Sequence, residues 1–294
     1  MENYNFELTK EFILKKLFDE NIVMEKDSDY PKISIVTPSY NQARFLERTI
    51  LSVLNQNYPN LEYIIIDGGS TDGSIEIIKK YGKYLAYWIS EKDEGQSDAI
   101  NKGFNKSTGE ILAWQNSDDI YLPGVFKQIA EIYNAKKCEI IMGDIAHISK
   151  DDVPIRTLRY GPWPKYGLKN VGMLISSQAT FWTRDLHMKC EPIRKDLHYA
   201  FDTEYFYRLV SNAKKVEHIP EILGCFRIYS NAKQNDTENY NKEDELVKII
   251  CSFRRGNFLL NFIEKLIRAI YLILKGNVLY IISPKKDAKR IIKK

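Results

Sequence analysis

The spacing of apolar residues between residues 32 and 133 switches repeatedly between a strand-like and a helix-like pattern. The β-branched run of residues 33–37 predicts a short strand that Pro38 stops. Leu46, Ile50 and Val53 then recur at helical spacing and predict an amphipathic helix that ends near Pro59. Further strands are expected at residues 63–66, at residues 85–90 and in the apolar run before Asp118, and further helices at residues 74–80, 98–105 and 122–133. Strands that alternate with helices indicate a mostly parallel sheet covered on both faces.

The regular alternation fades after about residue 150. Residues 179–182 and 221–229 are strand-like, and residues 202–210 have a helical pattern. Residues 231–244 are polar and predict a loop or linker. At the other end of the chain, residues 4–24 carry an apolar stripe that is typical of a helix. We therefore expect an α/β body with a helical extension at each end.

Composition places the chain among ordinary globular proteins. Of its 294 residues, 44% are apolar and 28% are charged. The four cysteines form no C-x-x-C pair, and the four histidines show no ligand spacing. These patterns argue against a zinc site or a disulfide framework and favour a reducing, cytoplasmic compartment. The N-terminus carries an acid early and lacks an apolar segment, so no secretory signal is expected.

Charge is distributed unevenly along the chain. The whole sequence has a net charge of +4, but residues 254–294 hold eleven Lys and Arg against two acids, a net charge of +9. Residues 1–253 therefore carry a net charge of −5. An acidic body argues against nucleic acid as a partner, and the basic tail points to an anionic surface, such as the inner face of a cell membrane.

The basic tail contains an amphipathic helix at residues 258–282. Glu264, Lys265, Arg268 and Lys275 interrupt its apolar residues, so the segment is a poor transmembrane span. The apolar residues of one helical face are Leu259, Phe262, Ile263, Leu266, Ile270, Ile273 and Leu274. Two interpretations stay open: the helix lies in a membrane interface, or it packs on the body or on a second subunit of a homo-oligomer.

Two adjacent carboxylates follow the apolar run that ends at Gln115. Asp118 and Asp119 are expected at the exposed carboxyl end of a buried strand, which is where α/β proteins place their ligands. Two oxygen ligands at such a position suit Mn²⁺ or Mg²⁺ and leave coordination positions for a substrate diphosphate. The alternative is a cap for the helix that follows, although one Asp is enough for that role.

Four segments in this order resemble the family 2 glycosyltransferases. They are residues 35–41 (IVTPSYN), 67–73 (DGGSTDG), 95–103 (GQSDAINKG) and 116–119 (NSDD). The resemblance covers about residues 32–230. It implies the GT-A fold, a Rossmann-like α/β fold with a mostly parallel sheet flanked by helices. It also implies an inverting transfer from a nucleotide-sugar donor to a glycan or lipid-linked glycan acceptor, with Mn²⁺ or Mg²⁺ as cofactor.

On this interpretation the chain has four parts. Residues 1–30 form an N-terminal helical extension, and residues 31–150 form the nucleotide-sugar-binding half of the GT-A domain. Residues 151–235 form the acceptor-binding half, and residues 236–294 hold a linker and basic amphipathic helices.

The resemblance also assigns roles to residues of the nucleotide-binding half. The expected nucleotide contacts are Thr37, Pro38, Tyr40, Asp67, Gly69, Asn101, Lys102, Asn116 and Ser117. Asp67 is expected to accept a hydrogen bond from a pyrimidine N–H of UDP or dTDP, because the second acid usual in relatives is Gly68 here. The alternative for Asp67 is a turn-starting residue before glycines. Asn116 replaces the first acid of the usual Asp-x-Asp motif, which leaves Asp118 as direct metal ligand with Asp119 supporting it.

The acceptor-binding half is expected to supply the general base. Asp202 occupies the position of the family's catalytic acid, and Glu204 is its rival. Both also suit a helix start, where Glu204 would pair with Arg208 one turn later. The residues expected to line the acceptor side are Gln178, Trp182, Tyr160 and Trp163, with a place in the core as the alternative. Arg227 and Tyr229 fall where relatives carry Arg and often His near the diphosphate.

Two rival functions remain at this stage. A nucleotidyltransferase that makes nucleotide sugars would want a Gly-rich loop with Lys or Arg after the first strand, whereas residues 38–41 read PSYN. A non-catalytic nucleotide-sugar-binding protein would not need the acids Asp118, Asp119 and Asp202.

Overall fold

A single mixed sheet runs through both halves of the chain. The computed structural model describes residues 17–19, 22, 29–170, 175–230, 236–253 and 258–274. The strands are β1 (Ile33–Ser39), β2 (Leu61–Asp67), β3 (Tyr87–Ser90), β4 (Ile111–Trp114), β5 (Ile120–Tyr121), β6 (Ile140–Ser149), β7 (Pro154–Leu158), β8 (Thr180–Thr183) and β9 (Val216–Ile228). In these residues they form one nine-stranded sheet of order β3-β2-β1-β4-β8-β6-β9-β5, with β7 paired to β6.

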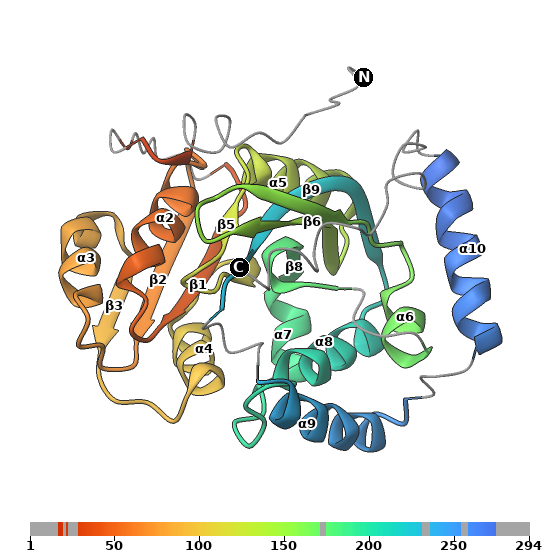
Figure 1. Ribbon diagram of the computed structural model, residues 1–294. Helices are drawn as coiled ribbons and strands as arrows, with labels where there is room; N and C mark the ends of the chain where they lie inside the picture. Colours follow the sequence, from red (N-terminus) through yellow and green to blue (C-terminus); the bar gives the residue numbers. More distant parts are fainter. Residues whose placement is uncertain are drawn as a thin grey trace.

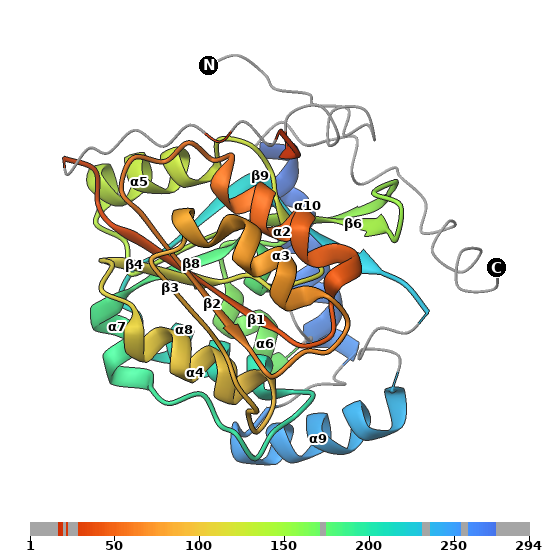
Figure 2. The same ribbon diagram turned by 90° about the vertical axis from the view of Figure 1, so that its left-hand side faces the viewer.

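Helices cover the sheet on both faces. They are α2 (Ala43–Leu54), α3 (Ser74–Tyr81), α4 (Gln96–Lys106), α5 (Val125–Lys136), α6 (Pro164–Asn170), α7 (Arg184–Cys190), α8 (Phe201–Asn212), α9 (Thr237–Ile250) and α10 (Phe258–Leu274). Helices α2, α3 and α5 lie on one face, and α4, α7 and α8 lie on the other (Figures 1 and 2). The predicted α/β fold with flanking helices is therefore confirmed.

The parallel arrangement belongs to the first four strands. β1 pairs in parallel with β2 and with β4, and β2 pairs in parallel with β3. From β8 onward the sheet is mixed, because β8 is antiparallel to both β4 and β6 whereas β6 and β9 are parallel. The long central strand β6 was not singled out by the sequence pattern. Parallel neighbours put the carboxyl ends of β1, β2, β3 and β4 at one edge of the sheet, where ligands bind in such folds.

Pro38 does not stop the first strand as predicted. β1 continues to Ser39, and Pro38 lies opposite Ile66 of β2. Pairing with β4 ends earlier, at Val36 and Trp114. Odd-numbered residues of β1 bond toward β2, as the bond from the Gly68 N–H to the Ser39 carbonyl shows. The missing N–H of Pro38 therefore faces the side that β4 has already left, so no ladder bond is lost.

The predicted linker at residues 231–244 is a helix from residue 237 onward. The Asp236 side chain accepts a hydrogen bond from the Asn239 N–H and caps α9. The helix buries Val247 against the body. A polar helix with one buried contact has little apolar periodicity, which is why the pattern did not reveal it.

Two predicted helices have different outcomes. The N-terminal helix at residues 4–24 lies outside the described residues, apart from residues 17–19 and 22. The amphipathic helix near the C-terminus is observed as α10, and the rest of the basic tail lies outside the described part. Among the described residues, none of the helices has the length and apolar character needed to cross a bilayer.

Candidate active site

A cavity of about 1040 Å³ lies where the two halves of the sheet meet, at the carboxyl ends of the parallel strands. Its lining from the first half includes Pro38, Tyr40, Gly68, Lys92, Asp93, Gln96, Asn116, Ser117 and Asp118. Its lining from the second half includes His147, Tyr160, Gln178, Tyr199, Asp202, Arg227, Tyr229 and Tyr240. The cavity therefore joins a donor-like half, with the acid motif, to the half in which the general base is expected.

Asp118 presents its carboxylate to this cavity. It follows β4 and is held by Tyr229, whose hydroxyl lies 2.8 Å from its Oδ2. Burial raises the pKa of Asp118, while the Tyr229 hydroxyl and the Arg227 charge act in the opposite direction. A buried carboxylate at the wall of a cavity is a good ligand for a cation, because a bound cation offsets its loss of hydration.

Asp119 is not among the residues that line the cavity, and it holds neighbouring site residues in place by hydrogen bonds. Its Oδ1 accepts the Arg227 N–H at 2.8 Å, and its Oδ2 accepts the side-chain amides of Gln178 at 2.6 Å and Asn116 at 3.2 Å. Asp119 is 1% exposed. Burial and the neighbouring Asp118 charge raise its pKa well above the ordinary value. The expected role of Asp119 as a metal residue is therefore corrected to that of a buried support for Asn116, Gln178 and the β9 backbone.

Asp67 is committed to its own turn. Its carboxylate accepts the N–H groups of Gly69 and Ser70 at 3.1 and 2.9 Å, and the hydroxyls of Ser70 and Ser90 at 2.5 and 2.6 Å. Four donors match the acceptor capacity of a carboxylate, and Asp67 is fully buried. In this structure Asp67 has the turn-forming role that was its alternative, and the expected contact with a nucleotide base is corrected.

Asp93 occupies the space that a side chain at residue 68 would need. A Cβ added to Gly68 would lie 2.7 Å from Asp93 Oδ2. Asp93 Oδ1 accepts the Gly95 N–H at 2.9 Å, and Gly95 has a φ of +112°, which an L side chain rarely adopts. Burial raises the pKa of Asp93, and the charges of Asp98 and Asp67 add to this shift. The carboxylate of Asp93, which comes from the loop after β3, therefore lies where a side chain at residue 68 would be.

Several other residues that were expected to contact the nucleotide use their polar groups in contacts within the protein. The Thr37 hydroxyl bonds the Tyr63 hydroxyl at 3.0 Å in the core. The Asn101 side chain bonds the backbone of Ile193 in both directions, at 2.8 and 2.9 Å. The Lys102 ammonium pairs with carboxylates at 3.1 and 3.3 Å. Gly69 serves the Asp67 turn with a φ of +83°.

The loop after β3 and the start of α4 hold three of the cavity residues that the sequence interpretation missed. Lys92, Asp93 and Gln96 line the cavity from this loop and from the start of α4. The signal was present in the sequence, because the loop follows a predicted strand at the same edge of the sheet as the acid motif. The nucleotide contacts expected from the sequence were instead Asn101 and Lys102, which lie farther along α4.

The two candidate bases have different surroundings. Asp202 lines the cavity in the first turn of α8, where its Oδ1 accepts the Thr203 N–H at 2.6 Å. Glu204 is 4% exposed and makes a bidentate pair with Arg208 at 2.7 and 2.8 Å. Arg208 also donates to the carbonyl of Pro192. The structure therefore gives Glu204 the helix-pairing role and leaves Asp202 as the acid that faces the cavity.

Helix α9 holds the loop that precedes Asp202. The Glu243 carboxylate accepts three successive backbone N–H groups, from His198, Tyr199 and Ala200, at 2.8, 2.6 and 3.0 Å. The Tyr199 hydroxyl donates to Asp236 at the start of α9. Tyr240, also on α9, lines the cavity. No sequence signal pointed to these residues, because the segment read as a linker.

Among the proposed acceptor-side residues, Gln178 and Tyr160 line the cavity whereas Trp182 does not. Trp182 is 1% exposed and packs among Phe104 and Trp114, so its role is corrected to a core aromatic. His147 lines the cavity near Tyr160. Burial, with the Arg156 charge, lowers the pKa of His147 to about 4, so its ring is neutral at pH 7 and its Nδ1 accepts from Arg156 Nε.

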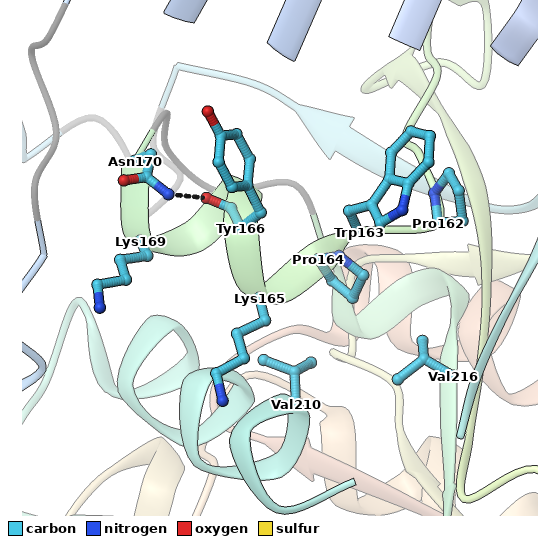
Figure 3. Close-up of a pocket in the computed structure, with 9 residues that line it drawn as sticks. All are labelled: Pro162, Trp163, Pro164, Lys165, Tyr166, Lys169, Asn170, Val210 and Val216. Carbon is cyan, nitrogen blue, oxygen red and sulfur yellow. Dashed lines mark hydrogen bonds between the residues drawn. The ribbon is translucent and has the colours of Figure 1, made fainter. Parts of the chain in front are cut away.

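Trp163 lies at a second hollow of about 440 Å³, away from the acid pair. Figure 3 shows Pro162, Trp163 and the first turn of α6 above Val210 of α8, with Lys165 and Lys169 projecting from α6. The wall is mostly apolar and contains no acid. This hollow therefore lacks the groups that a nucleotide-sugar reaction needs.

The single carboxylate of Asp118 suits a cation that takes most of its ligands from the substrate diphosphate and from water. Within the described residues, no three Asp, Glu, His or Cys side chains gather as an all-protein metal site. Mg²⁺ is commonly held by one or two carboxylates together with substrate phosphates and water. Asp118 fits that arrangement as the protein ligand, with the Tyr229 hydroxyl bonded to its Oδ2.

Comparisons with known proteins agree with this geometry. An uncharacterized glycosyltransferase of Nostoc sp. is 34% identical over 127 residues, which are 42% of this chain and 39% of that protein. The putative teichuronic acid biosynthesis glycosyltransferase TuaG of Bacillus subtilis is 30% identical over 137 residues, 45% of this chain and 54% of that protein. The matches thus span about half or less of the length of these relatives.

Among solved structures, S. aureus TarS 1-349 in complex with UDP-GlcNAc has a TM-score of 0.59 at 15% identity, over 82% of this chain and 71% of that chain. A mannosyltransferase from Pyrobaculum calidifontis in complex with GDP-Man and Mn²⁺ has a TM-score of 0.59 at 16% identity, over 84% and 70%. Both show the shared GT-A fold. The family model described as glycosyl transferase family 2 matches residues 34–200, more than half of the 294 residues. The chain therefore belongs to glycosyl transferase family 2.

Proposed function

We propose that this protein is an inverting glycosyltransferase that moves a sugar from a nucleoside-diphosphate sugar to a hydroxyl of a glycan or lipid-linked glycan. One observation carries the proposal: Asp118, from the loop after β4, and Asp202, from the first turn of α8, line the same cavity. An acid beside a diphosphate site and an acid beside an acceptor site are the two carboxylates that this reaction needs. The nucleotide sugars bound to TarS and to the Pyrobaculum enzyme support a donor of this class.

The donor half would hold the nucleotide and diphosphate. Tyr40 is 61% exposed at the cavity and offers a ring on which a base can stack, and Pro38 lies beside it. Asn116 and Ser117 line the wall next to Asp118. Mn²⁺ or Mg²⁺, held by Asp118 and the diphosphate, would offset the negative charge that develops on the leaving group.

The acceptor half would carry out the proton transfer. The acceptor hydroxyl oxygen forms a bond to the anomeric carbon as the bond from that carbon to the diphosphate oxygen breaks. The hydroxyl proton passes to the Asp202 carboxylate. Attack from the face opposite the leaving group inverts the anomeric centre, and a single displacement needs no covalent sugar–enzyme intermediate.

Asp93 is the best candidate for recognition of the base. Its Oδ2 lies beside Gly68 at the cavity wall, and burial has already raised its pKa. A pyrimidine N3–H donated to this carboxylate would compensate for the loss of hydration. We therefore propose UDP or dTDP as the donor nucleotide. Asp93, instead of Asp67, is the acid that accepts the hydrogen bond from the pyrimidine N3–H.

The variant Asp93→Asn is expected to bind UDP about 10- to 150-fold more weakly, since a hydrogen bond to a charged group contributes about 1.5–3 kcal/mol. ADP and GDP, which lack the pyrimidine N3–H, should be affected much less. Isothermal titration calorimetry with the three nucleotides measures both effects. Equal losses for all three nucleotides, or none for UDP, would show that Asp93 does not read the base.

The clamp between Glu243 and the backbone N–H groups of residues 198–200 should matter for transfer but not for donor binding. Glu243→Gln replaces one acceptor oxygen with an amide that cannot accept those N–H bonds, so the loop before Asp202 should shift. We expect kcat to fall roughly 10- to 100-fold, since small misplacement of a reacting group costs that much. Donor affinity should stay unchanged. The control is Glu245→Gln, because Glu245 is exposed and pairs only with Lys248 among the contacts described.

A parallel loss of donor affinity in Glu243→Gln would instead indicate general disturbance of the fold. An unchanged kcat would show that the loop keeps its position without the clamp.

The acceptor class and compartment are part of the same proposal. The name of TuaG places that relative in teichuronic acid biosynthesis, which supports a glycan as the acceptor of the sugar. The four cysteines of the chain are buried and free, which suits a reducing, cytoplasmic environment. We propose a growing surface polysaccharide or lipid-linked glycan as acceptor.

Slow hydrolysis of nucleotide sugars tests the function without a known acceptor. The protein is incubated with a panel of UDP-, dTDP- and GDP-sugars, with Mn²⁺ or with chelator, and release of the nucleoside diphosphate is measured. We expect release from one or a few UDP- or dTDP-sugars, dependent on metal. Formation of a nucleotide sugar and pyrophosphate from a nucleoside triphosphate and a sugar 1-phosphate would favour a nucleotidyltransferase. Tight binding without any turnover, even with acceptor glycans, would favour a non-catalytic binding protein.

A further inference from the structure

Helix α10 contacts the body through its polar side. Glu264 is 8% exposed and pairs with Arg268 at 3.3 Å. Arg268 Nη1 donates to the carbonyl of Arg159 at 3.0 Å. One turn further along α10, the Tyr271 hydroxyl lies 3.0 Å from Nδ1 of His218. Glu264, Arg268 and Tyr271 stand at positions i, i+4 and i+7 and therefore share one side of α10. In a helix on the surface of a soluble protein this polar side would face water, whereas here it faces the body.

This contact continues as a polar network into the sheet. Nε2 of His218 lies 3.1 Å from Oδ1 of Asp144, which is fully buried in β6. Asp144 also accepts from Arg159 Nη1 at 2.9 Å and from the Tyr160 N–H at 2.7 Å. Specific hydrogen bonds of this kind fix which side of α10 faces the body.

The apolar side of α10 is left uncovered. Its nine exposed residues are Phe258, Leu259, Phe262, Ile263, Leu266, Ile267, Ile270, Ile273 and Leu274, with exposed fractions of 37–84%. Figure 1 shows α10 along the outer edge of the molecule, on the side away from α3 and β3. Within the described part of the chain, the body therefore does not cover the apolar face. An apolar face of this size marks an interaction site.

We propose that the exposed face of α10 binds an anionic lipid bilayer, with the helix axis parallel to the membrane surface. Charge identifies this partner. The sequence from residue 254 to the end has a net charge of +9, so the apolar face belongs to a strongly basic segment. Acidic headgroups neutralise that charge while the apolar residues enter the boundary between headgroups and acyl chains.

A second copy of the chain fits this face less well. A two-fold contact through α10 would bring two segments of +9 together and add like-charge repulsion to the gain from apolar burial. Trp163, which is 49% exposed, also lies beside the helix, with its ring 5.9 Å from that of Tyr271. The proposal does not depend on the reaction proposed above.

Co-sedimentation with vesicles tests the proposal on the full chain. The wild-type protein should sediment with vesicles of phosphatidylcholine and phosphatidylglycerol and much less with phosphatidylcholine alone. High NaCl should weaken binding because salt screens the charges. The triple variant Phe262→Ser, Leu266→Ser, Ile270→Ser should lower the partition coefficient by about 100-fold or more, since each residue loses apolar burial. These side chains are exposed, so the variant should fold and keep its thermal midpoint.

A matched control changes three exposed apolar residues of α9. The variant Leu246→Ser, Ile249→Ser, Ile250→Ser should sediment like the wild type. Wild-type protein that stays in the supernatant with both kinds of vesicle overturns the proposal, and so does equal loss of binding in the two triple variants. Sedimentation equilibrium completes the test: a wild-type dimer that becomes monomeric in the α10 variant, without vesicle binding, would assign this face to a second copy.

Discussion

Asp118→Ala is expected to reduce sugar transfer by about 10³-fold, because the variant loses the one cavity-facing carboxylate of the acid motif. The loss should appear in binding as well as in turnover. Titration of UDP with Mn²⁺ should show weakened affinity in the variant, whereas uridine, which lacks the diphosphate, should bind as it does to the wild type. This comparison separates a cation site at the diphosphate from general damage to the nucleotide pocket.

Two further variants make this result specific to Asp118. Tyr229→Phe removes the hydroxyl that bonds Asp118 Oδ2 but leaves the carboxylate in place, so its effect on transfer should be small by comparison. Asp119→Asn should act differently, through stability, because Asp119 is buried and bonds the Arg227 N–H and two side-chain amides. A wild-type enzyme that keeps full activity in chelator would show that the metal assignment is wrong.

Much of the donor half follows from local sequence pattern. Its strands are apolar on both faces and stop at polar loops, so the alternation of strands and helices and the edge that carries the site are visible without the structure. Pro38, Tyr40, Asn116, Ser117 and Asp118 all line the cavity for this reason. Each of them comes directly at or after the end of a parallel strand.

The remaining site residues depend on contacts between distant parts of the chain. The resemblance assigns Asp67 to the nucleotide, but in the structure Asp67 bonds within its own turn and also accepts a hydrogen bond from Ser90 of β3. Glu204 pairs with Arg208, and Glu243 binds the backbone of residues 198–200, more than 40 residues earlier in the chain. A single sequence shows that these residues are polar, but it does not show which partner satisfies each of them.

The orientation of α10 illustrates the same limit. Periodicity showed an apolar face and a basic face and left open what covers the apolar one. The hydrogen bonds of Arg268 with Arg159 and of Tyr271 with His218 decide that question, because they turn the apolar residues outward. The amphipathic pattern therefore predicted the helix, whereas its orientation depended on two polar contacts with the body that have no periodic signal.

The general base gives the second large expected effect. Asp202→Asn keeps the shape of the side chain and removes its basicity, so transfer should fall by roughly 10²–10⁴-fold, the usual contribution of a positioned base. Donor affinity should barely change, because Asp202 lies in the half of the cavity assigned to the acceptor. Transfer rates and UDP-sugar affinity, measured on the same preparation, separate the two quantities.

Glu204→Gln is the matched control for Asp202→Asn, two residues away on the same helix. Glu204 makes a bidentate pair with Arg208 and is nearly buried, so its replacement should lower the thermal midpoint of unfolding and leave kcat close to the wild-type value. The opposite pattern, with Glu204→Gln inactive and Asp202→Asn normal, would mean that the base is misassigned. If neither variant loses activity, the acceptor half of the cavity does not hold the reacting hydroxyl, and the proton must leave through a group on another wall.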